Sequence, residues 1–218
     1  MPIRVLVTGF EPFHGALRNP SGDAARALDG RLVLADGSPA GEVAGRVLPV
    51  LWDVAAAELL ALVRAMDPAI VICTGMAQGT FRVERFADDA RRASPDNAER
   101  LPDPPRPARS VRLETGLPVA QVEAAIAAAG GPVEPSEDAG AFICNEVFFA
   151  LMSAVRGGAC PGVRRAGFLH VPNDRHVPGV IAQETVEAAI EAAVRETLAA
   201  LAVLAALQPP AASEREER

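Results

Sequence analysis

The fold class is set first by the stretch Ile3-Arg4-Val5-Leu6-Val7-Thr8-Gly9, a compact run of β-branched and apolar residues that ends at a glycine. A continuous apolar run of this length is typical of a buried strand. Residues 69–74 form a second such run and end at Gly75, and residues 167–172 form a third. Each of these runs is therefore predicted to be a strand.

Segments with helical spacing alternate with these strands. The pattern predicts helices over residues 54–66, 119–129 and about 179–207, and another that begins near Cys144. A further helix is predicted to open at Asn19-Pro20-Ser21, with Ser21 as its N-cap, and to run to Leu28. Weaker patterns predict strands over residues 31–34, 42–50, 80–86 and 110–114. The alternation predicts an α/β fold, a single-domain three-layer sandwich over residues 1–207 with a mostly parallel twisted sheet flanked by helices. Residues 94–107 are expected to form a surface loop, and residues 208–218 a disordered polar tail.

Composition excludes several classes of protein. The net charge of -7 argues against nucleic acid or an anionic membrane as the main partner. The chain contains no lysine, which removes Schiff-base chemistry and the lysine of a P-loop. Cys73, Cys144 and Cys160 have neither a disulfide framework nor paired zinc spacing, so no metal and no other cofactor is expected. With no signal peptide recognised at the N-terminus and no apolar run long enough to span a bilayer, we expect a cytoplasmic protein.

The strongest chemical signal is the segment Gly140-Ala141-Phe142-Ile143-Cys144-Asn145-Glu146-Val147. It is interpreted as a short apolar strand followed by a helix, with Cys144 at the first turn of that helix. Unpaired backbone N–H groups and the helix dipole favour a thiolate there. His170 lies near the end of a later strand and is a candidate base for the thiol. Read separately, Cys144 is more often a small buried residue and His170 a core histidine, but together they suggest a cysteine hydrolase.

Four blocks of the sequence, in order, resemble the pyroglutamyl peptidase I (pyrrolidone-carboxylate peptidase) family of cysteine peptidases. The first is residues 5–13 with Asn19-Pro20-Ser21 behind it. The second is Gly75-Met76-Ala77 with the later Val83-Glu84-Arg85. The third is residues 139–145 around Cys144, and the fourth is residues 167–172 around His170. The resemblance therefore spans residues 3–172.

The resemblance implies a cysteine exopeptidase, an omega-peptidase, that hydrolyses the amide bond after an N-terminal pyroglutamyl residue through a thioester acyl-enzyme. It implies Cys144 as nucleophile, His170 as base and Glu84 as the group that orients the imidazole. The segment after Glu84 is a few residues shorter than the family pattern, so Asp88, Asp89 and Asp96 stay as alternatives to Glu84. Two other functions stay open: a related amidase for another small acyl group, and a non-catalytic lactam-binding protein.

The same resemblance implies which residues form the pocket. A neutral lactam ring is best held between aromatic faces, and Phe10, Phe13 and Phe142 flank the matched motifs. Asn19 would shape the adjacent loop, Met76 would contribute its backbone, and Arg91 would assist the oxyanion site. The expected partners are N-terminally pyroglutamylated peptides and further copies of the same chain, in a dimer or tetramer.

Overall fold

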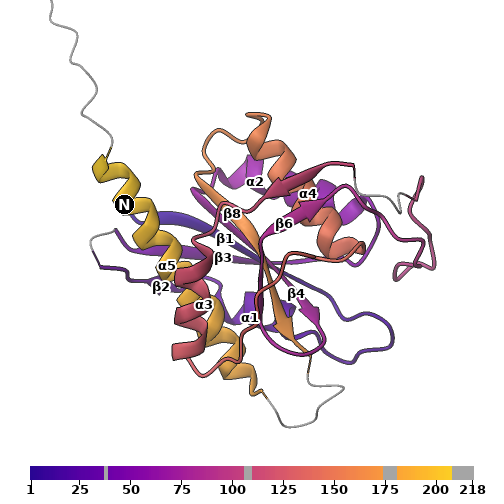
Figure 1. Ribbon diagram of the computed structural model, residues 1–218, viewed down its shortest axis with the longest axis horizontal. Coiled ribbons are helices and arrows are strands. Elements are labelled where there is room, and N and C mark those ends of the chain that lie inside the picture. Colours follow the sequence, from indigo (N-terminus) through magenta and orange to yellow (C-terminus); the bar gives the residue numbers. More distant parts are fainter. Residues whose placement is uncertain (37–38, 106–109, 174–180, 208–218) are drawn as a thin grey trace, which may run out of the picture.

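The computed structural model describes residues 1–36, 39–105, 110–173 and 181–207. Within these residues the centre is a six-stranded sheet with the order β2-β3-β1-β4-β8-β5 (Figure 1). The strands are β1 (Ile3–Phe10), β2 (Leu32–Val33), β3 (Gly41–Leu48), β4 (Ile70–Ala77), β5 (Arg82–Glu84) and β8 (Arg165–Pro172). The four long strands β1, β3, β4 and β8 are parallel, and the short edge strands β2 and β5 are antiparallel to their neighbours. The predicted α/β fold with a mostly parallel sheet is confirmed.

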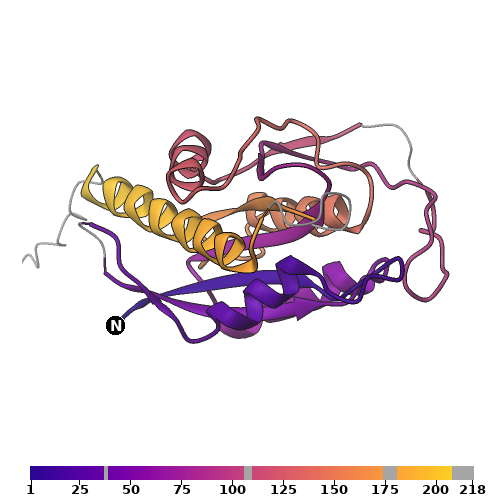
Figure 2. The same cartoon turned by 90° about the horizontal axis from the view of Figure 1, so that it is seen from below.

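Helices cover both faces of this sheet. The helices α1 (Pro20–Leu28), α3 (Val119–Ala128) and α5 (Gln183–Leu207) pack on one face, and α2 (Val54–Met66) and α4 (Ile143–Arg156) pack on the other. Figures 1 and 2 show α3 and α5 side by side on their face. Because side chains alternate along a strand, Leu169 and Val171 pack in the core beneath α1, α3 and α5, whereas Phe168 packs in the core beneath α2 and α4. His170 has the same parity as Phe168, which places it on the α4 face.

The start of α1 is tied to the end of β1 by two side chains. The N-cap is Asn19, whose Oδ1 accepts a hydrogen bond from the Ser21 N–H at 3.1 Å, and Pro20 is the first helical residue. The prediction of Ser21 as N-cap is therefore wrong by two positions. The Ser21 hydroxyl instead accepts from the Phe10 N–H at 3.1 Å and donates to Asn19 Oδ1 at 2.8 Å. These bonds fix where Phe10 leaves the sheet.

The segment predicted as one strand over residues 80–86 forms two. β5 pairs with β8, and β6 (Phe86–Asp88) pairs with β7 (Arg112–Glu114) in a separate two-stranded sheet. The switch occurs at Arg85, whose N–H donates to the Ser136 carbonyl and whose carbonyl accepts from the Thr115 N–H. Tertiary partners on two sides therefore divide a continuous extended run.

The strand expected immediately before Cys144 is absent from the described structure. The chain between α3 and α4 makes only isolated bridges, Phe81 with Val133 and Glu84 with Ser136, before a turn at Gly140 with φ of +81°. A left-handed residue so close to the helix is incompatible with a strand that runs into it. Cys144 therefore lies at the N-terminus of α4, which packs on the face of the sheet, and does not follow a strand of the sheet.

The terminal helix α5 begins a few residues later than predicted and ends at Leu207 as predicted. It begins at Gln183, and although its first turns are buried, Val203, Leu204 and Leu207 in its last turns are exposed. The predicted tail over residues 208–218, residues 106–107 of the predicted loop and residues 179–180 of the predicted helix lie outside the described residues.

Candidate active site

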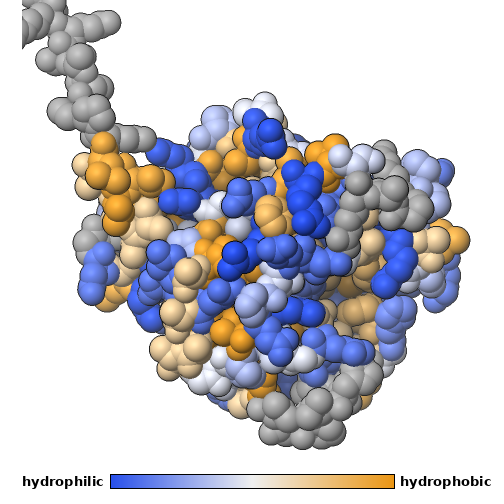
Figure 3. All heavy atoms as spheres, viewed as in Figure 1, coloured by the Kyte–Doolittle hydropathy of each residue, from blue (hydrophilic) through white to orange (hydrophobic). Residues whose placement is uncertain are grey.

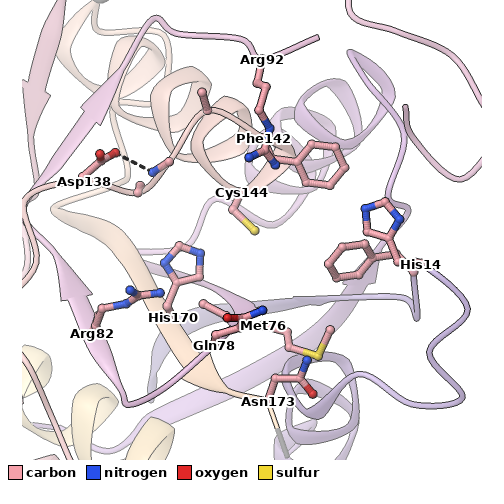
Figure 4. Close-up of a pocket in the computed structure, with 15 residues that line it drawn as sticks. His14, Met76, Gln78, Arg82, Arg92, Asp138, Phe142, Cys144, His170 and Asn173 are labelled. Carbon is pink, nitrogen blue, oxygen red and sulfur yellow. Dashed lines mark hydrogen bonds between the residues drawn. The ribbon is translucent and has the colours of Figure 1, made fainter. Parts of the chain in front are cut away.

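The parallel strands β4 and β8 bring Gly75 and His170 together, since the two residues are register partners. On the other side of β8, Arg82 of β5 pairs with His170. Cys144 is the second residue of α4, which packs over this face of the sheet. Figure 4 shows the Cys144 sulfur and the His170 imidazole lying next to each other and lining one cavity. The two residues that the sequence singled out are therefore neighbours.

Gly75 makes room for the thiol. A Cβ at this position would lie 2.8 Å from Cys144 Sγ and 2.8 Å from Phe168 Cζ. Real side chains do not approach that closely, so any larger residue would displace the sulfur or the Phe168 ring. Gly75 in β4 therefore provides the space that the Cys144 thiol occupies.

The His170 imidazole lies against the Glu84 carboxylate. His170 Nδ1 lies 2.7 Å from Glu84 Oε1, and the Ser136 hydroxyl donates to Glu84 Oε2 at 2.5 Å. The Glu84 side chain is fully buried and His170 is nearly so. Because a carboxylate only accepts, Nδ1 carries a hydrogen and Nε2 is left with its lone pair. This is the tautomer that a general base requires.

The three alternative carboxylates are engaged elsewhere. The Asp88 carboxylate accepts two hydrogen bonds from the Arg112 guanidinium, at 2.9 and 3.1 Å. Asp89 accepts from the backbone N–H groups of residues 110 and 111, and Asp96 from those of residues 52, 98 and 100. Glu84 is therefore the one of the four that the structure places against His170.

The electrostatic state of Cys144 differs from the expectation. Burial disfavours the thiolate and, with the nearby Glu84 carboxylate, raises the pKa of the thiol to about 12, while the Cys144 backbone N–H acts in the opposite direction. Desolvation therefore opposes the thiolate that the backbone N–H favours. A thiol with a raised pKa has to give up its proton when the sulfur attacks.

The cavity in front of these residues has a volume of about 470 Å³. One side is aromatic: the Phe13 and Phe142 ring centroids are 6.0 Å apart, and the His14 ring stacks on Phe142 at 6.3 Å. The wall is completed mainly by polar groups and by the chain before α4. Its lining residues are Phe13, His14, Met76, Ala77, Gln78, Arg82, Arg92, Asp138, Ala139, Gly140, Ala141, Phe142, Cys144, His170 and Asn173.

Phe10 and Asn19 lie one layer further in. They line a small cavity of about 10 Å³ that adjoins the main one and shares Phe13, Met76, Phe142 and Cys144 with it. Only 3% of Phe10 is exposed. Asn19 also donates from Nδ2 to the Glu11 carbonyl at 3.0 Å, which holds the loop that carries Phe13. The five predicted pocket residues thus gather around one space next to the thiol.

Comparisons with known proteins agree with this geometry. A model of the family described as pyroglutamyl peptidase matches residues 3–208. The pyrrolidone-carboxylate peptidase of Cupriavidus pinatubonensis is 37% identical over 211 residues, which is 94% of each chain, and that of Chromobacterium violaceum is 40% identical over 77% of each. The structure of pyrrolidone carboxyl peptidase from Thermococcus litoralis superposes with a TM-score of 0.79 at 30% identity, covering 91% of this chain and 94% of that one. The chain belongs to the pyroglutamyl peptidase family.

Membership of this family makes the protein a cysteine peptidase that removes N-terminal pyroglutamate. Pyroglutamyl peptidase I from Bacillus amyloliquefaciens has the same fold, with a TM-score of 0.79 and 27% identity over 90% of this chain and 97% of its own. Over the described residues, no group of three or more His, Cys, Asp or Glu side chains is placed to hold a metal ion. Nor does any helix in the described parts of the chain have the length and apolarity to cross a membrane.

Arg91, expected at the oxyanion site of this peptidase, does not line the cavity. Its guanidinium donates to Asp53 Oδ1 at 2.6 Å and to Glu146 Oε1 at 2.7 Å, and lies over the Trp52 ring at 5.3 Å. Because two carboxylates hold it, it is not available to an oxyanion at Cys144. Arg91 instead joins the start of α2 to the first turn of α4.

The two polar residues that follow Cys144, Asn145 and Glu146, also have a structural explanation. Asn145 is fully buried; its Oδ1 accepts from the Asp88 N–H at 2.9 Å, and its Nδ2 donates to the carbonyls of Asp88 and Ala90 at 2.7 and 3.0 Å. Glu146 accepts from the Asp53 N–H as well as from Arg91. Both side chains therefore anchor the helix start that carries Cys144.

Sequence reasoning missed several residues that line the cavity, among them His14, Gln78, Arg82, Arg92, Asp138 and Asn173. For Arg82 a signal existed, because it lies two residues before Glu84 and so faces the same side of the strand. Arg92 adjoins Arg91, and nothing in the sequence says which of the two points at the cavity. Its guanidinium lies 5.8 Å over the Phe142 ring.

Proposed function

We propose that Cys144, His170 and Glu84 carry out the peptidase reaction of this chain. The observation that carries the proposal is the 2.7 Å contact between His170 Nδ1 and Glu84 Oε1, which leaves Nε2 as the acceptor in the cavity shared with Cys144. His170 Nε2 takes the thiol proton as Cys144 Sγ attacks the carbonyl carbon that follows the lactam ring. Glu84 stabilises the imidazolium that forms.

The first tetrahedral intermediate then collapses to the amine product and an acyl-enzyme. His170 donates the proton to the leaving nitrogen, the C–N bond breaks, and a thioester to Cys144 remains. Water, deprotonated by His170, attacks this thioester; the C–S bond breaks, and His170 returns the proton to the sulfur, which releases pyroglutamate and the free thiol. The oxyanion in both steps is assigned to the Cys144 backbone N–H, since the first N–H groups of α4 have no acceptor within the helix.

The lactam ring is assigned to the aromatic side of the cavity. A flat ring between two others needs about 3.5 Å on each side, or about 7 Å between the outer rings. Phe13 and Phe142 are 6.0 Å apart, so we expect them to separate by about 1 Å when the ring enters. Phe10, Asn19 and Met76 form the base of this site, as lining residues of the adjoining cavity.

The test is release of a fluorescent amine from a pyroglutamyl amide under reducing conditions. We expect wild type and the matched variant Cys160→Ala to be active and Cys144→Ala to be inactive, since Cys160 is a free, buried thiol that does not line the cavity. Wild-type protein that is folded but inactive on this amide, and active on other small acyl amides, would support the related amidase instead. Folded protein that binds pyroglutamate without turnover would support the lactam-binding alternative.

We also propose that the peptidase is a homo-oligomer that associates through the end of α5. Val203 and Leu207 are 59% and 74% exposed, and Figure 3 shows apolar side chains gathered at this end of the molecule. Leu32, in the edge strand β2 that contacts α5, and Leu34, just after that strand, are exposed as well. Sedimentation should show a dimer or tetramer that dissociates in Val203→Glu, whereas a wild-type monomer would refute the proposal.

We further propose a cytoplasmic location for a single domain over residues 1–207. Cys73, Cys144 and Cys160 are all free thiols, the state that a reducing compartment preserves. Fractionation of cells that produce the protein should recover it with cytoplasmic markers. Limited proteolysis should leave residues 1–207 as one resistant fragment.

A further inference from the structure

Arg82 is a cavity residue that the steps above do not use. It lies on β5 as the register partner of His170, and its side chain, 31% exposed, lines the cavity beside the imidazole. Figure 4 shows Arg82 on the side of His170 that faces away from His14 and Phe142. The guanidinium is therefore next to the base and remote from the aromatic side of the cavity.

This position is where the leaving part of the substrate has to lie. His170 protonates the leaving nitrogen, so that nitrogen lies against the imidazole. The lactam occupies the aromatic side, and the residue that follows the scissile bond consequently points the other way. The side chain of that residue then comes close to Arg82.

Arg82 has little to bind within the protein. Among the described residues its buried Nε has no hydrogen-bond partner, and the carboxylate that it approaches, Glu84 Oε1, is 3.9 Å away. Both Glu84 oxygens already accept shorter bonds from His170 and Ser136. A guanidinium with free donors and restricted access to water is suited to bind a carboxylate.

One opposing charge lines the same part of the cavity. Asp138 is exposed, and its Oδ1 accepts the Gly140 N–H at 2.8 Å. Water around an exposed carboxylate screens its field, whereas two-thirds of the Arg82 side chain is shielded. Arg82 therefore dominates close to His170, and Asp138 acts at the rim.

We propose that Arg82 selects pyroglutamyl peptides in which the residue after the scissile bond carries a carboxylate. This inference rests on the proposed function, because it assumes that His170 protonates the leaving amine. It names a substrate class within that activity, pyroglutamyl peptides with an acidic second residue. Arg82 acts on binding of the leaving group and not through Glu84.

The test compares two substrates that differ only in charge, pyroglutamyl-glutamyl amide and pyroglutamyl-glutaminyl amide. We expect wild-type protein to favour the glutamyl substrate by about tenfold in kcat/KM, the effect of one charged hydrogen bond in a partly shielded site. In Arg82→Gln this ratio should fall to about one. The matched control is Arg85→Gln, in which the lost guanidinium contacts Glu123 at 3.9 Å outside the cavity, and its ratio should equal that of wild type.

The ratio separates selection from a structural role. If Arg82 only supported Glu84 and His170, Arg82→Gln would slow both substrates equally and leave the ratio unchanged, which would overturn the proposal. A wild-type ratio near one would overturn it too, as would a preference that survives in Arg82→Gln. If wild type cleaves neither substrate nor the fluorogenic amide, the proposed function itself fails.

Discussion

Replacing Gly75 with alanine tests whether the position of the thiol is set by its fit against β4. The added methyl would lie 2.8 Å from Cys144 Sγ and 2.8 Å from Phe168 Cζ. Non-bonded heavy atoms prefer about 3.5–4.0 Å, so the sulfur or the ring has to move by about 0.7–1.2 Å. A misplacement of about 1 Å at a reacting atom lowers the rate about 100-fold, and overpacking costs about 1–3 kcal/mol of stability.

The assay is kcat/KM for amine release from a pyroglutamyl amide, measured together with urea unfolding. Gly41→Ala is the matched control, because its methyl would lie 2.7 Å from Leu198 Cδ1, in the core on the opposite face of the sheet. We expect Gly41→Ala to lose stability but keep activity, and Gly75→Ala to lose both. If Gly75→Ala is as active as wild type, or if the two variants lose activity alike, the fit of the thiol against β4 does not set its position.

Three further predictions concern the residues around the nucleophile. In Glu84→Gln the amide no longer holds His170 in the required tautomer, so kcat should fall by about 100-fold or more while KM changes little. Ser136→Ala should lower kcat by less. Equal kcat in wild type and Glu84→Gln would contradict the role of Glu84. The rate of Cys144 alkylation by iodoacetamide should rise about tenfold per pH unit through pH 9 and beyond, with Cys144→Ser as the blank. The reason is that a thiol pKa raised to about 12 leaves the thiolate fraction small, and this fraction grows as pH rises. A plateau below pH 8 would show a lowered pKa instead. Asn145→Ala should lower the free energy of unfolding, measured by urea denaturation, by about 2–4 kcal/mol. The substitution leaves the buried N–H of Asp88 and two carbonyls without partners. A loss under about 0.5 kcal/mol would contradict the anchoring role.

Much of the fold followed from local patterns. The buried runs around Val5 and Ile72 are strands because continuous β-branched segments suit a sheet covered on both faces, and residues 54–66 form α2 with the predicted bounds. Local patterns failed where tertiary contacts divide or displace a segment. Arg85 switches between two sheets, and residues 129–142 pack at the sheet edge as isolated bridges although the apolar stretch before Cys144 was expected to be a strand.

The sequence by itself determined the kind of chemistry. Cys144 and His170 stand in motifs long enough to indicate a cysteine hydrolase of a particular family, because those motifs also encode the turns and the helix start that present them. Which carboxylate contacts His170 was decided only by the tertiary structure, since the sequence left three aspartates as alternatives to Glu84. The pairing of β5 with β8 brings Glu84 to the imidazole and sends the aspartates to other partners.

The protonation state of the thiol and the shape of the site were likewise decided by tertiary structure. A helix N-terminus favours thiolate whenever it is considered alone, but burial depends on what β4, β8 and Glu84 place around the sulfur, and here burial prevails. Tertiary contacts also decide which of two adjacent arginines reaches the cavity. Asp53 and Glu146 bind Arg91 away from it, whereas Arg92 lines it. Residue types and spacing are local properties, whereas desolvation and side-chain direction depend on segments that only folding brings together.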